Sequence, residues 1–509
     1  MEKIKTGQAP VAATGDLDII PSHMSHQDMA ATTTSYNETD TEQYLRFSPA
    51  RKRVIVFSLS FCSFLAPIGS TSILSAVPEV AATYNTTGSI INASNALYLA
   101  FMGIAAPFWG PFSQVWGRRP IFLTCAFLFF VFSIGTALAP NLGAYFVFRI
   151  LSACQGTCFL VVGSSAIGDV YEPRARATAL GFFLSGTLLG PAFGPVIAGV
   201  IVTYSSWRTV FWLQTALGGV ATLLVFFLFP ETIPYKTNGE LADHTIAEKT
   251  KILWHRVSPF RVGILLFSYP NLLFAGVAAG ALVWNQYSLL TPIRYVLNPR
   301  FHLTTPIQSA LFYIAPGCGY LAGTFVGGRW ADHVVKKWIR KRNGVRVPED
   351  RLKSCIAFIF VICFCILVYG WTVDKAVGGI AVPVIAMFLQ GVSQLFCFPS
   401  LNTYCLDVMQ SKGRSAEVIA GNYMFRYIFA ALGSGLVLPA IDSIGVGWFS
   451  TISALFLAFS GFTVWLTTVF GSQWRQRVDE RNSHQQATRD AQETQKQAQS
   501  QAVAVDEKA

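Results

Sequence analysis

The chain has 509 residues, of which 52% are hydrophobic and only 13% are charged. Soluble domains carry about a quarter charged residues, so this composition excludes an ordinary set of soluble domains. The net charge of +11 would fit a nucleic-acid-binding protein, but the basic residues lie in short segments between apolar runs. Such placement is typical of membrane topology signals. The chain is therefore predicted to have the lipid bilayer, and no nucleic acid, as its partner.

Twelve apolar runs follow one another along the chain, and several exceed the ~18–20 residues that cross a bilayer. Their predicted bounds are 54–77, 92–112, 120–139, 143–165, 178–203, 209–229, 262–287, 306–328, 354–372, 378–402, 416–438 and 447–471. A polar gap separates the sixth run from the seventh. The pattern predicts an all-α polytopic membrane protein with twelve transmembrane helices in two six-helix halves.

Five segments follow from this division. They are a cytosolic disordered tail (1–50), an N-terminal six-helix bundle (51–230), a cytosolic linker (231–261), a C-terminal six-helix bundle (262–472) and a cytosolic polar tail (473–509). Both tails are expected in the cytosol, because the predicted outer loops and flanks hold few basic residues. These few are Arg208, Arg294, Arg300 and Lys375. On the same outer side, Asn85 begins an Asn-Thr-Thr sequon and is a candidate glycosylation site.

The two halves contain matching polar motifs. Gly110-Pro-Phe-Ser-Gln114, followed by Arg118-Arg119, aligns with Gly328-Arg-Trp-Ala-Asp332, followed by Lys336-Lys337. Asp169 and Arg176 align in the same way with Asp407 and Arg414. Both matches fall in equivalent predicted inner loops. A duplicated six-helix unit is the natural explanation.

The loop after the second apolar run resembles the most diagnostic motif of the major facilitator superfamily, G-x-x-x-D-x-x-G-R-R/K. Gly110, Gly117, Arg118 and Arg119 match this motif, whereas Gln114 stands where the family has an aspartate. The fifth run contains Gly190-Pro191-Ala-Phe-Gly194-Pro195, which resembles the glycine-proline motif associated with antiporters. Pro195 departs from that motif, since a second glycine is usual there. The resemblance covers nearly the whole chain apart from its tails.

Finer features resemble the fungal twelve-span drug:proton antiporter family, in particular the quinidine-resistance transporters and the spore-wall dityrosine exporter. The features are Trp207-Arg208 with Phe211-Trp212, Pro230-Glu-Thr232, Pro348-Glu-Asp-Arg-Leu352 and Asn422-Tyr-Met-Phe-Arg426. This resemblance implies a secondary active transporter that exports small organic molecules or drugs by alternating access. It further implies proton antiport driven by the proton gradient, no cofactor, a plasma-membrane location, a role in multidrug efflux and a monomeric protein.

The inner loops carry candidate gating residues. The arginines at 118 and 119 cannot enter the bilayer cheaply, so they either anchor the topology or bond groups of the other half when the cytosolic side is closed. The same membrane level holds the remaining charged candidates, which are Asp169, Arg176, Glu231, Asp332 and Asp407. Gln114 is expected to bond an arginine such as Arg176, more weakly than an aspartate would. On the fifth run, Gly190, Pro191 and Gly194 predict either close helix packing or a hinge.

Two intramembrane arginines are the main candidates for the transport pathway. An arginine inside a membrane is costly, so Arg149 and Arg426 are expected to face a cavity or a partner, unless backbone carbonyls satisfy them. Arg149 also occupies the place of the superfamily's membrane-embedded arginine. No Asp, Glu or His lies in the middle of any predicted span. The other pathway candidates are Tyr98, Asn285, Gln286, Tyr313, Gln390, Gln394, Asn422 and Tyr423.

Two functional alternatives remain open. The arginines without a buried acid also fit an exporter of organic anions or carboxylates. A protein of another class, a non-transporting nutrient sensor, would have a similar membrane part. An enzyme is not expected, because no cluster of catalytic residues occurs at one membrane level. No metal site is predicted either, since the Cys363-x-Cys365 pair lacks histidine neighbours.

Overall fold

The computed structural model of the chain describes residues 44–233, 258–302, 306–410 and 412–506. Over these residues the secondary structure is helical and contains no strand. Eleven of the described helices are long and apolar enough to cross a membrane. The last of them, Ser415–His484, breaks at Gly445 and supplies two spans, so the twelve predicted spans are present. The tail before residue 44 and most of the predicted linker lie outside the described residues.

Six long helices form the N-terminal half. They are α3 (Pro49–Thr71), α5 (Gly88–Trp116), α6 (Arg118–Ala137), α7 (Leu142–Val170), α8 (Arg176–Tyr204) and α9 (Arg208–Leu228). A short helix, α4 (Val77–Thr83), precedes the exposed sequon residue Asn85. Local chemistry sets several boundaries: Asn141 accepts a hydrogen bond from the Ala144 amide at 2.8 Å and caps α7. Gly117, with a φ of 98°, makes the tight turn between α5 and α6.

The C-terminal half is less regular. Its helices are α11 (Pro259–Ser268), α12 (Pro270–Leu290), α13 (Ile293–Phe301), α14 (Pro306–Leu311), α15 (Ile314–Lys341), α16 (Ile356–Lys375), α17 (Ala381–Gln410) and α18 (Ser415–Asp506), with a 3-10 helix, η3, over Pro348–Ser354. The predicted span 262–287 divides at Pro270, which cannot donate a helical hydrogen bond. α15 runs past the predicted end at 328, because its polar last turns continue the helix beyond the apolar layer.

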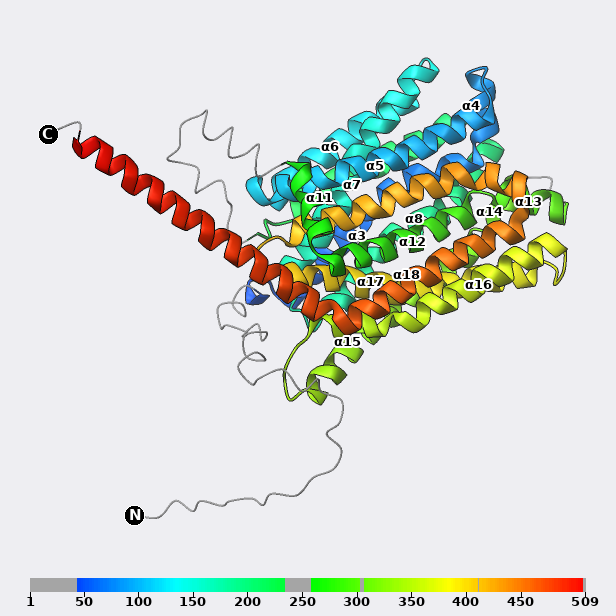
Figure 1. Cartoon of the computed structure of the whole chain (residues 1–509). Helices are drawn as coiled ribbons and strands as arrows, with labels where there is room; N and C mark the ends of the chain where they lie inside the picture. The colour runs from blue at the N-terminus through cyan, green and yellow to red at the C-terminus, as the bar shows by residue number, and fades with distance from the viewer. Residues whose placement is uncertain (1–43, 234–257, 303–305, 411, 507–509) are drawn as a thin grey trace, which may run out of the picture. The chain divides into compact units, whose positions relative to one another are not determined.

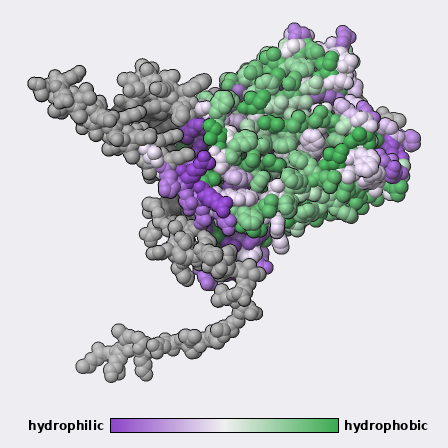
Figure 2. Space-filling view, in the orientation of Figure 1, coloured by the Kyte–Doolittle hydropathy of each residue, from purple (hydrophilic) through white to green (hydrophobic). Residues whose placement is uncertain are grey.

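The long helices lie side by side in one bundle (Figure 1). Hydrophobic residues cover most of the bundle face seen in Figure 2, and hydrophilic residues gather at its two ends. Many of the outward side chains are large and apolar, including Phe226 and Phe364, which are 52% and 67% exposed. A soluble monomer rarely exposes an apolar surface of this size, whereas a lipid-facing surface requires it.

Small residues on α8 allow close packing against a neighbouring helix. A Cβ atom on Gly186 would lie 2.2 Å from the carbonyl oxygen of Ser60, and one on Gly190 would lie 2.8 Å from the amide nitrogen of Ile68. Both neighbours belong to α3. Glycines four residues apart therefore let α8 approach the α3 backbone directly. In the other direction α8 packs against α15 and α17, so it connects the two halves.

Candidate functional site

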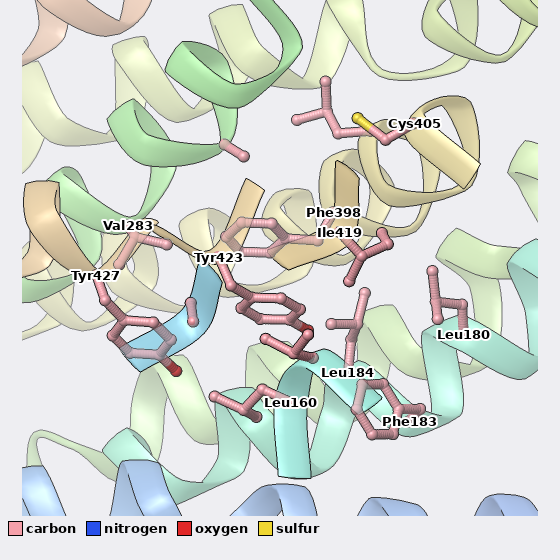
Figure 3. Packing of buried hydrophobic residues seen from close by; sticks show 14 of the residues in the cluster. Leu160, Leu180, Phe183, Leu184, Val283, Phe398, Cys405, Ile419, Tyr423 and Tyr427 are labelled. Carbon is pink, nitrogen blue, oxygen red and sulfur yellow. The ribbon is translucent and has the colours of Figure 1, made fainter. Parts of the chain in front are cut away.

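A small closed cavity, with a free volume of about 20 Å³, lies between the two halves. Five helices line it: α3, α8, α12, α17 and α18. Its lining residues are Pro67, Leu184, Thr187, Leu188, Pro191, Val283, Gln286, Tyr287, Phe398, Tyr423, Arg426 and Tyr427. Figure 3 shows Tyr423 of the C-terminal half beside Leu184 of the N-terminal half. The cavity volume is far below the ~300–1,000 Å³ of small-molecule sites, so the halves must move apart before a substrate can fit there.

Hydrogen bonds between the halves close this cavity on both sides. Near the predicted outer ends of α3 and α12, the Ser70 hydroxyl lies 3.1 Å from the Tyr287 hydroxyl. Toward the other end, the Ser164 hydroxyl of α7 lies 2.9 Å from the Tyr423 hydroxyl of α18. Both bonds are buried and both join residues of different halves. Opening the cavity to the outer side requires the Ser70–Tyr287 bond to break. Opening it to the other side requires the Ser164–Tyr423 bond to break.

Arg426 gives the cavity a positive charge. Its guanidinium carbon lies 4.1 Å from the ring centre of Phe398 and 4.8 Å from that of Tyr423, and its side chain is buried. The Nε atom has no hydrogen-bond partner among the described residues. None of the described residues that line the cavity carries a carboxylate. An anionic or electron-rich group of a bound molecule would therefore meet an uncompensated cation there.

Several predicted pathway amides are buried with unsatisfied atoms. Gln286 lines the cavity, and its Nε2 has no partner among the described residues. The same holds for both polar side-chain atoms of Gln390, for Oε1 of Gln394 and for Oδ1 of Asn285 and Asn422. Buried amides normally have hydrogen-bond partners. These side chains therefore offer unused donors and acceptors for a bound molecule in the C-terminal half. Of the ten predicted pathway residues, the cavity lining includes Gln286, Tyr423 and Arg426.

The other predicted tyrosines have structural contacts. The Tyr98 hydroxyl donates to the Ala66 carbonyl at 3.1 Å, and the Tyr313 hydroxyl donates to the Leu290 carbonyl at 2.9 Å. Neither residue lines the cavity. Conversely, Tyr287 and Tyr427 line it although the sequence analysis did not select them. Tyr427 follows Arg426 directly, and Tyr287 follows Gln286, so a wider selection around each chosen residue would have included both.

Arg149 is buried inside the N-terminal half and does not line the cavity. Its guanidinium carbon lies 4.9 Å from the ring centre of Tyr98, 5.6 Å from that of Tyr145 and 5.7 Å from that of Phe211. Long hydrogen bonds of 3.4 Å reach the Gly69 carbonyl and Oδ1 of Asn95. Rings and neutral oxygens therefore hold this cation, and no carboxylate is among its described contacts.

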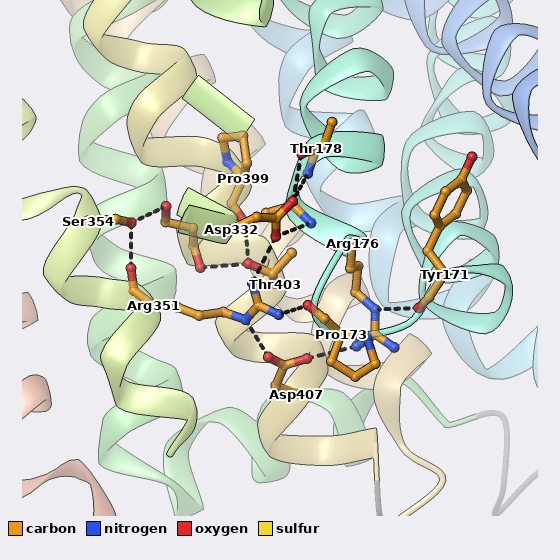
Figure 4. Close-up of polar contacts among 12 residues, drawn as sticks. Tyr171, Pro173, Arg176, Thr178, Asp332, Arg351, Ser354, Pro399, Thr403 and Asp407 are labelled. Carbon is orange, nitrogen blue, oxygen red and sulfur yellow. Dashed lines mark hydrogen bonds and ion pairs between the residues drawn. The ribbon is translucent and has the colours of Figure 1, made fainter. Parts of the chain in front are cut away.

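A buried ion-pair network closes the predicted cytosolic end, meaning the end of the bundle at which α3 and α8 begin and α7 and α17 end (Figure 4). Asp407 of α17 pairs with Arg176 of α8 at 2.8 Å, with Arg346 at 2.6 Å and with Arg351 of η3. The Asp407 side chain is 0% exposed. Arg351 also donates to the Pro173 carbonyl. The Arg176–Asp407 ion pair and the hydrogen bond from Arg351 to Pro173 both join the two halves.

Asp332 of α15 binds the first turn of α8. Its carboxylate accepts hydrogen bonds from the amides of Ala177 at 3.3 Å and Thr178 at 2.9 Å, and from the Thr178 hydroxyl at 2.6 Å. Nη1 of Arg351 lies 3.8 Å from Oδ1 of Asp332. Gly328 makes this approach feasible, because a Cβ there would lie 2.7 Å from the Ala177 carbonyl oxygen. A carboxylate at a helix N-terminus is a favourable arrangement, so this contact stabilises the closed end.

The equivalent loop of the N-terminal half makes a weaker connection. Gln114 donates from Nε2 to the Gly413 carbonyl at 3.0 Å, just before α18 begins. The prediction that Gln114 bonds an arginine such as Arg176 was wrong, because the Arg176 guanidinium donates to Asp407 and Gln410 instead. Arg118 pairs with Asp169 at 3.1 Å inside its own half, and its amide donates to Glu231 at 2.9 Å.

The residue Arg119 is exposed and donates to the Phe226 carbonyl at 2.8 Å, again within the N-terminal half. Two roles were expected of Arg118 and Arg119, anchoring the topology or bonding groups of the other half, and their described contacts include no bond to the other half. Arg351 makes such a contact instead, through the Pro173 carbonyl, while Arg346 pairs with Asp407 inside the C-terminal half. The sequence analysis missed both, although Arg351 lies in a Pro-Glu-Asp-Arg-Leu motif whose charges directly precede an apolar run.

Residues 59–434 match the family model of the Major Facilitator Superfamily. The chain belongs to this superfamily, which consists of membrane transporters and not of enzymes. Its twelve spans in two halves and its central cavity are consistent with that membership.

The similar proteins include fungal exporters. The chain is 22% identical to the MFS antiporter QDR3 of Candida albicans over 84% of this chain and 79% of that protein. It is 24% identical to dityrosine transporter 1 of Saccharomyces cerevisiae, over 80% and 77%. It is also 24% identical to citrate exporter 1 of Aspergillus niger, over 86% and 89%. The predicted resemblance to quinidine-resistance and dityrosine transporters is thus confirmed.

Among solved structures, the human organic anion transporter MFSD10 has a similar fold. The TM-score is 0.64 at 14% identity, and the match covers 82% of this chain and all of that chain. The predicted all-α architecture with two six-helix halves is thereby confirmed.

Proposed function

We propose that the protein is a proton-coupled exporter of small organic molecules that works by alternating access. The observation that carries this proposal is the closed cavity between the halves, bounded on one side by Ser70–Tyr287 and on the other by Ser164–Tyr423. A space closed by breakable contacts on both sides is what alternating access requires of an intermediate state. The fungal exporters among its relatives support the direction of transport.

Proton coupling needs a group that changes charge during the cycle. None of the described residues that line the cavity is acidic. The predicted cytosolic end, in contrast, contains Asp332 and Asp407. We assign the coupling to Asp407: opening the cytosolic end separates its carboxylate from Arg176, which makes its protonation easier. The proton gradient is then the energy source, and the proposal involves no cofactor.

The test is uptake into proteoliposomes of known orientation. Labelled quinidine, dityrosine and citrate are offered with and without a proton gradient, and Arg426→Ala serves as the transport-deficient control. Gradient-dependent movement of at least one solute, abolished by a protonophore, is the expected result. Gradient-independent movement would contradict proton coupling. No movement of any solute by wild-type protein that binds one of them would favour the nutrient sensor.

A second candidate function, export of an organic anion or carboxylate, is favoured by one specific observation. Arg426 faces the cavity with an unpaired Nε and without a carboxylate in the described lining. Citrate competing better than quinidine for a transported solute, and losing that advantage in Arg426→Ala, would establish this candidate. The reverse order of competition would exclude it.

We further propose that one chain in the plasma membrane is the working unit. The cavity is lined from both halves of the same polypeptide, so a second copy is not needed to complete it. Sedimentation in detergent and imaging of a fluorescent fusion test the two parts of this proposal separately.

A further inference from the structure

A second, larger space opens at the predicted cytosolic end, on the side of the bundle between α3, α8 and α15. Including its open mouth it encloses about 1480 Å³. Its walls come from the first turns of α3 and α8 and from the last turns of α15. These turns mark the boundary between the predicted apolar layer and the cytosol. We call this space the lateral groove, and it is separate from the central cavity.

The rim of the lateral groove is basic. Arg53 of α3 and Arg329 and Lys336 of α15 line it, and all three side chains are exposed. Within the described residues none of the three forms a salt bridge. The carboxylate on the wall belongs to Asp332, which is buried and already accepts three hydrogen bonds from α8. The cations are therefore available to an external anion.

The inner wall of the lateral groove is apolar and aromatic. Val56 and Phe57 of α3 and Phe182 of α8 line it, one to two turns deeper in the apolar layer than the basic rim. Phe57 is 63% exposed. Phe182 packs edge-on against Phe325 of α15, with ring centres 6.2 Å apart. A molecule that fills the lateral groove would meet positive charge at one end and apolar surface along the rest.

We propose that the lateral groove binds one anionic phospholipid of the cytosolic leaflet. Its phosphate lies among Arg53, Arg329 and Lys336, and an acyl chain lies along Phe57 and Phe182. A soluble anion would match the basic rim but not the aromatic wall, whereas an anionic lipid matches both. Because α3 and α8 belong to one half and α15 to the other, the bound lipid connects the halves beside Asp332. It therefore favours the closed cytosolic end.

The experiment measures lipid binding to the purified full-length protein by native mass spectrometry. Phosphatidylserine and phosphatidylcholine with identical acyl chains are titrated separately. The tested variant carries Arg53→Gln and Lys336→Gln. The matched control carries Arg51→Gln and Lys337→Gln, which remove the same charge from the same two helices at positions outside the lateral groove. Thermal unfolding in phosphatidylcholine alone establishes that each variant is folded.

Wild type and the control pair are expected to prefer phosphatidylserine. The groove pair should bind it about 25-fold more weakly, because each basic residue near a lipid surface contributes roughly a fivefold preference for an anionic lipid. Binding of phosphatidylcholine should not change. Equal losses in both pairs would show a diffuse surface attraction and would overturn the proposal.

The source of the phosphate is tested by competition. Inorganic phosphate and glycerophosphoserine, which lack acyl chains, should not displace bound phosphatidylserine at equal concentration. Displacement by either would mean that the apolar wall takes no part, and would also overturn the proposal. If the groove pair fails to fold, the single exposed substitutions Lys336→Gln and Lys337→Gln provide the same comparison. None of these measurements needs a transport substrate, so they do not depend on the proposed function.

Discussion

Corresponding glycines in the two halves make the same contact, but the polar residue that follows each of them does not. A Cβ on Gly110 would lie 2.5 Å from the Ala416 carbonyl oxygen at the start of α18, and one on Gly328 would lie 2.7 Å from the Ala177 carbonyl oxygen at the start of α8. One turn later the C-terminal half has Asp332, with three hydrogen bonds to α8. The N-terminal half has Gln114, with one bond to Gly413.

The aligned residues Asp169 and Asp407, and Arg176 and Arg414, also differ in whether they bond across the halves. Asp407 and Arg176 bond each other across the halves at 2.8 Å. Their counterparts stay within their own halves: Asp169 pairs with Arg118 at 3.1 Å, and Arg414 pairs with Glu417 at 2.5 Å. The duplicated backbone thus provides two similar contact points, and the side chains concentrate the closure at one of them, between α8 and the α15–α17 side.

The largest effect is expected when this difference is tested at its buried centre. Asp407→Asn leaves three arginines without their carboxylate and should cost about 3–5 kcal/mol of stability, as for a broken buried ion pair. Asp169→Asn, the aligned change, should cost less, about 1.5–3 kcal/mol, because Asp169 is partly exposed and has one described arginine partner. Thermal unfolding of detergent-extracted protein, together with membrane abundance, measures both. Equal losses of stability in the two variants would mean that both halves contribute equally to closing the cytosolic end.

The two buried arginines give the next comparison. Arg426→Ala should lose most transport while the protein still folds, because Arg426 lines the cavity. Arg426→Lys should restore part of it, since lysine keeps the charge but not the planar guanidinium. Arg149→Ala should lower the unfolding temperature more than Arg426→Ala does, because three rings lose a cation–π partner worth ~0.5–2 kcal/mol each. Transport per folded molecule separates the roles. A stable Arg149→Ala without transport would place Arg149 in the mechanism instead.

The fold was predictable because its determinants are local and repeated. Run length, the distribution of arginine and lysine, and the recurrence of Gly110-x-x-x-Gln114 as Gly328-x-x-x-Asp332 suffice for the twelve spans and for their division into two halves. The interruption at Tyr269–Pro270 and the extension of α15 to Lys341 are harder to predict. A proline in an apolar run can kink a helix or end it, and a polar helix outside the membrane leaves no apolar pattern.

The site was only partly predictable, because burial and partner choice depend on which helix faces meet. Arg149 and Arg426 look alike in the sequence, yet α7 turns Arg149 toward α5 and α9 while α18 turns Arg426 toward the cavity. Arg351 lies in a short charged segment that reads as a topology anchor. Its role follows from contacts with Asp407 and Pro173, which are distant in the sequence and close in space.

A smaller effect is expected at Asp332 itself. Asp332→Asn keeps one acceptor oxygen but removes the charge that favours the N-terminus of α8, so the closed cytosolic end should weaken by about 1.5–3 kcal/mol. A reporter Thr187→Cys in the cavity should then react faster with a membrane-impermeant maleimide applied from the cytosolic side. Asp374→Asn, the same change at the outer end of α16, is the matched control and should leave this rate unchanged. Equal acceleration in both would point to general loosening of the bundle.

Gln114 is where we expect the smallest effects. Gln114→Ala removes one partly exposed hydrogen bond to Gly413 and should cost ~0.5–1.5 kcal/mol, so transport should fall less than in Asp332→Asn. Gln114→Asp loses the same bond, because a carboxylate cannot donate to a carbonyl. It gains a negative charge beside the first turn of α18, worth ~0.3–1 kcal/mol at a helix N-terminus. These two changes nearly cancel, so we expect Gln114→Asp to be active, with maleimide labelling at Thr187→Cys close to that of the parent protein. Initial transport rates per surface molecule measure the order of the variants. If Gln114→Ala is inactive while Asp332→Asn is normal, the N-terminal half carries the closure and the asymmetry drawn from the contacts is reversed.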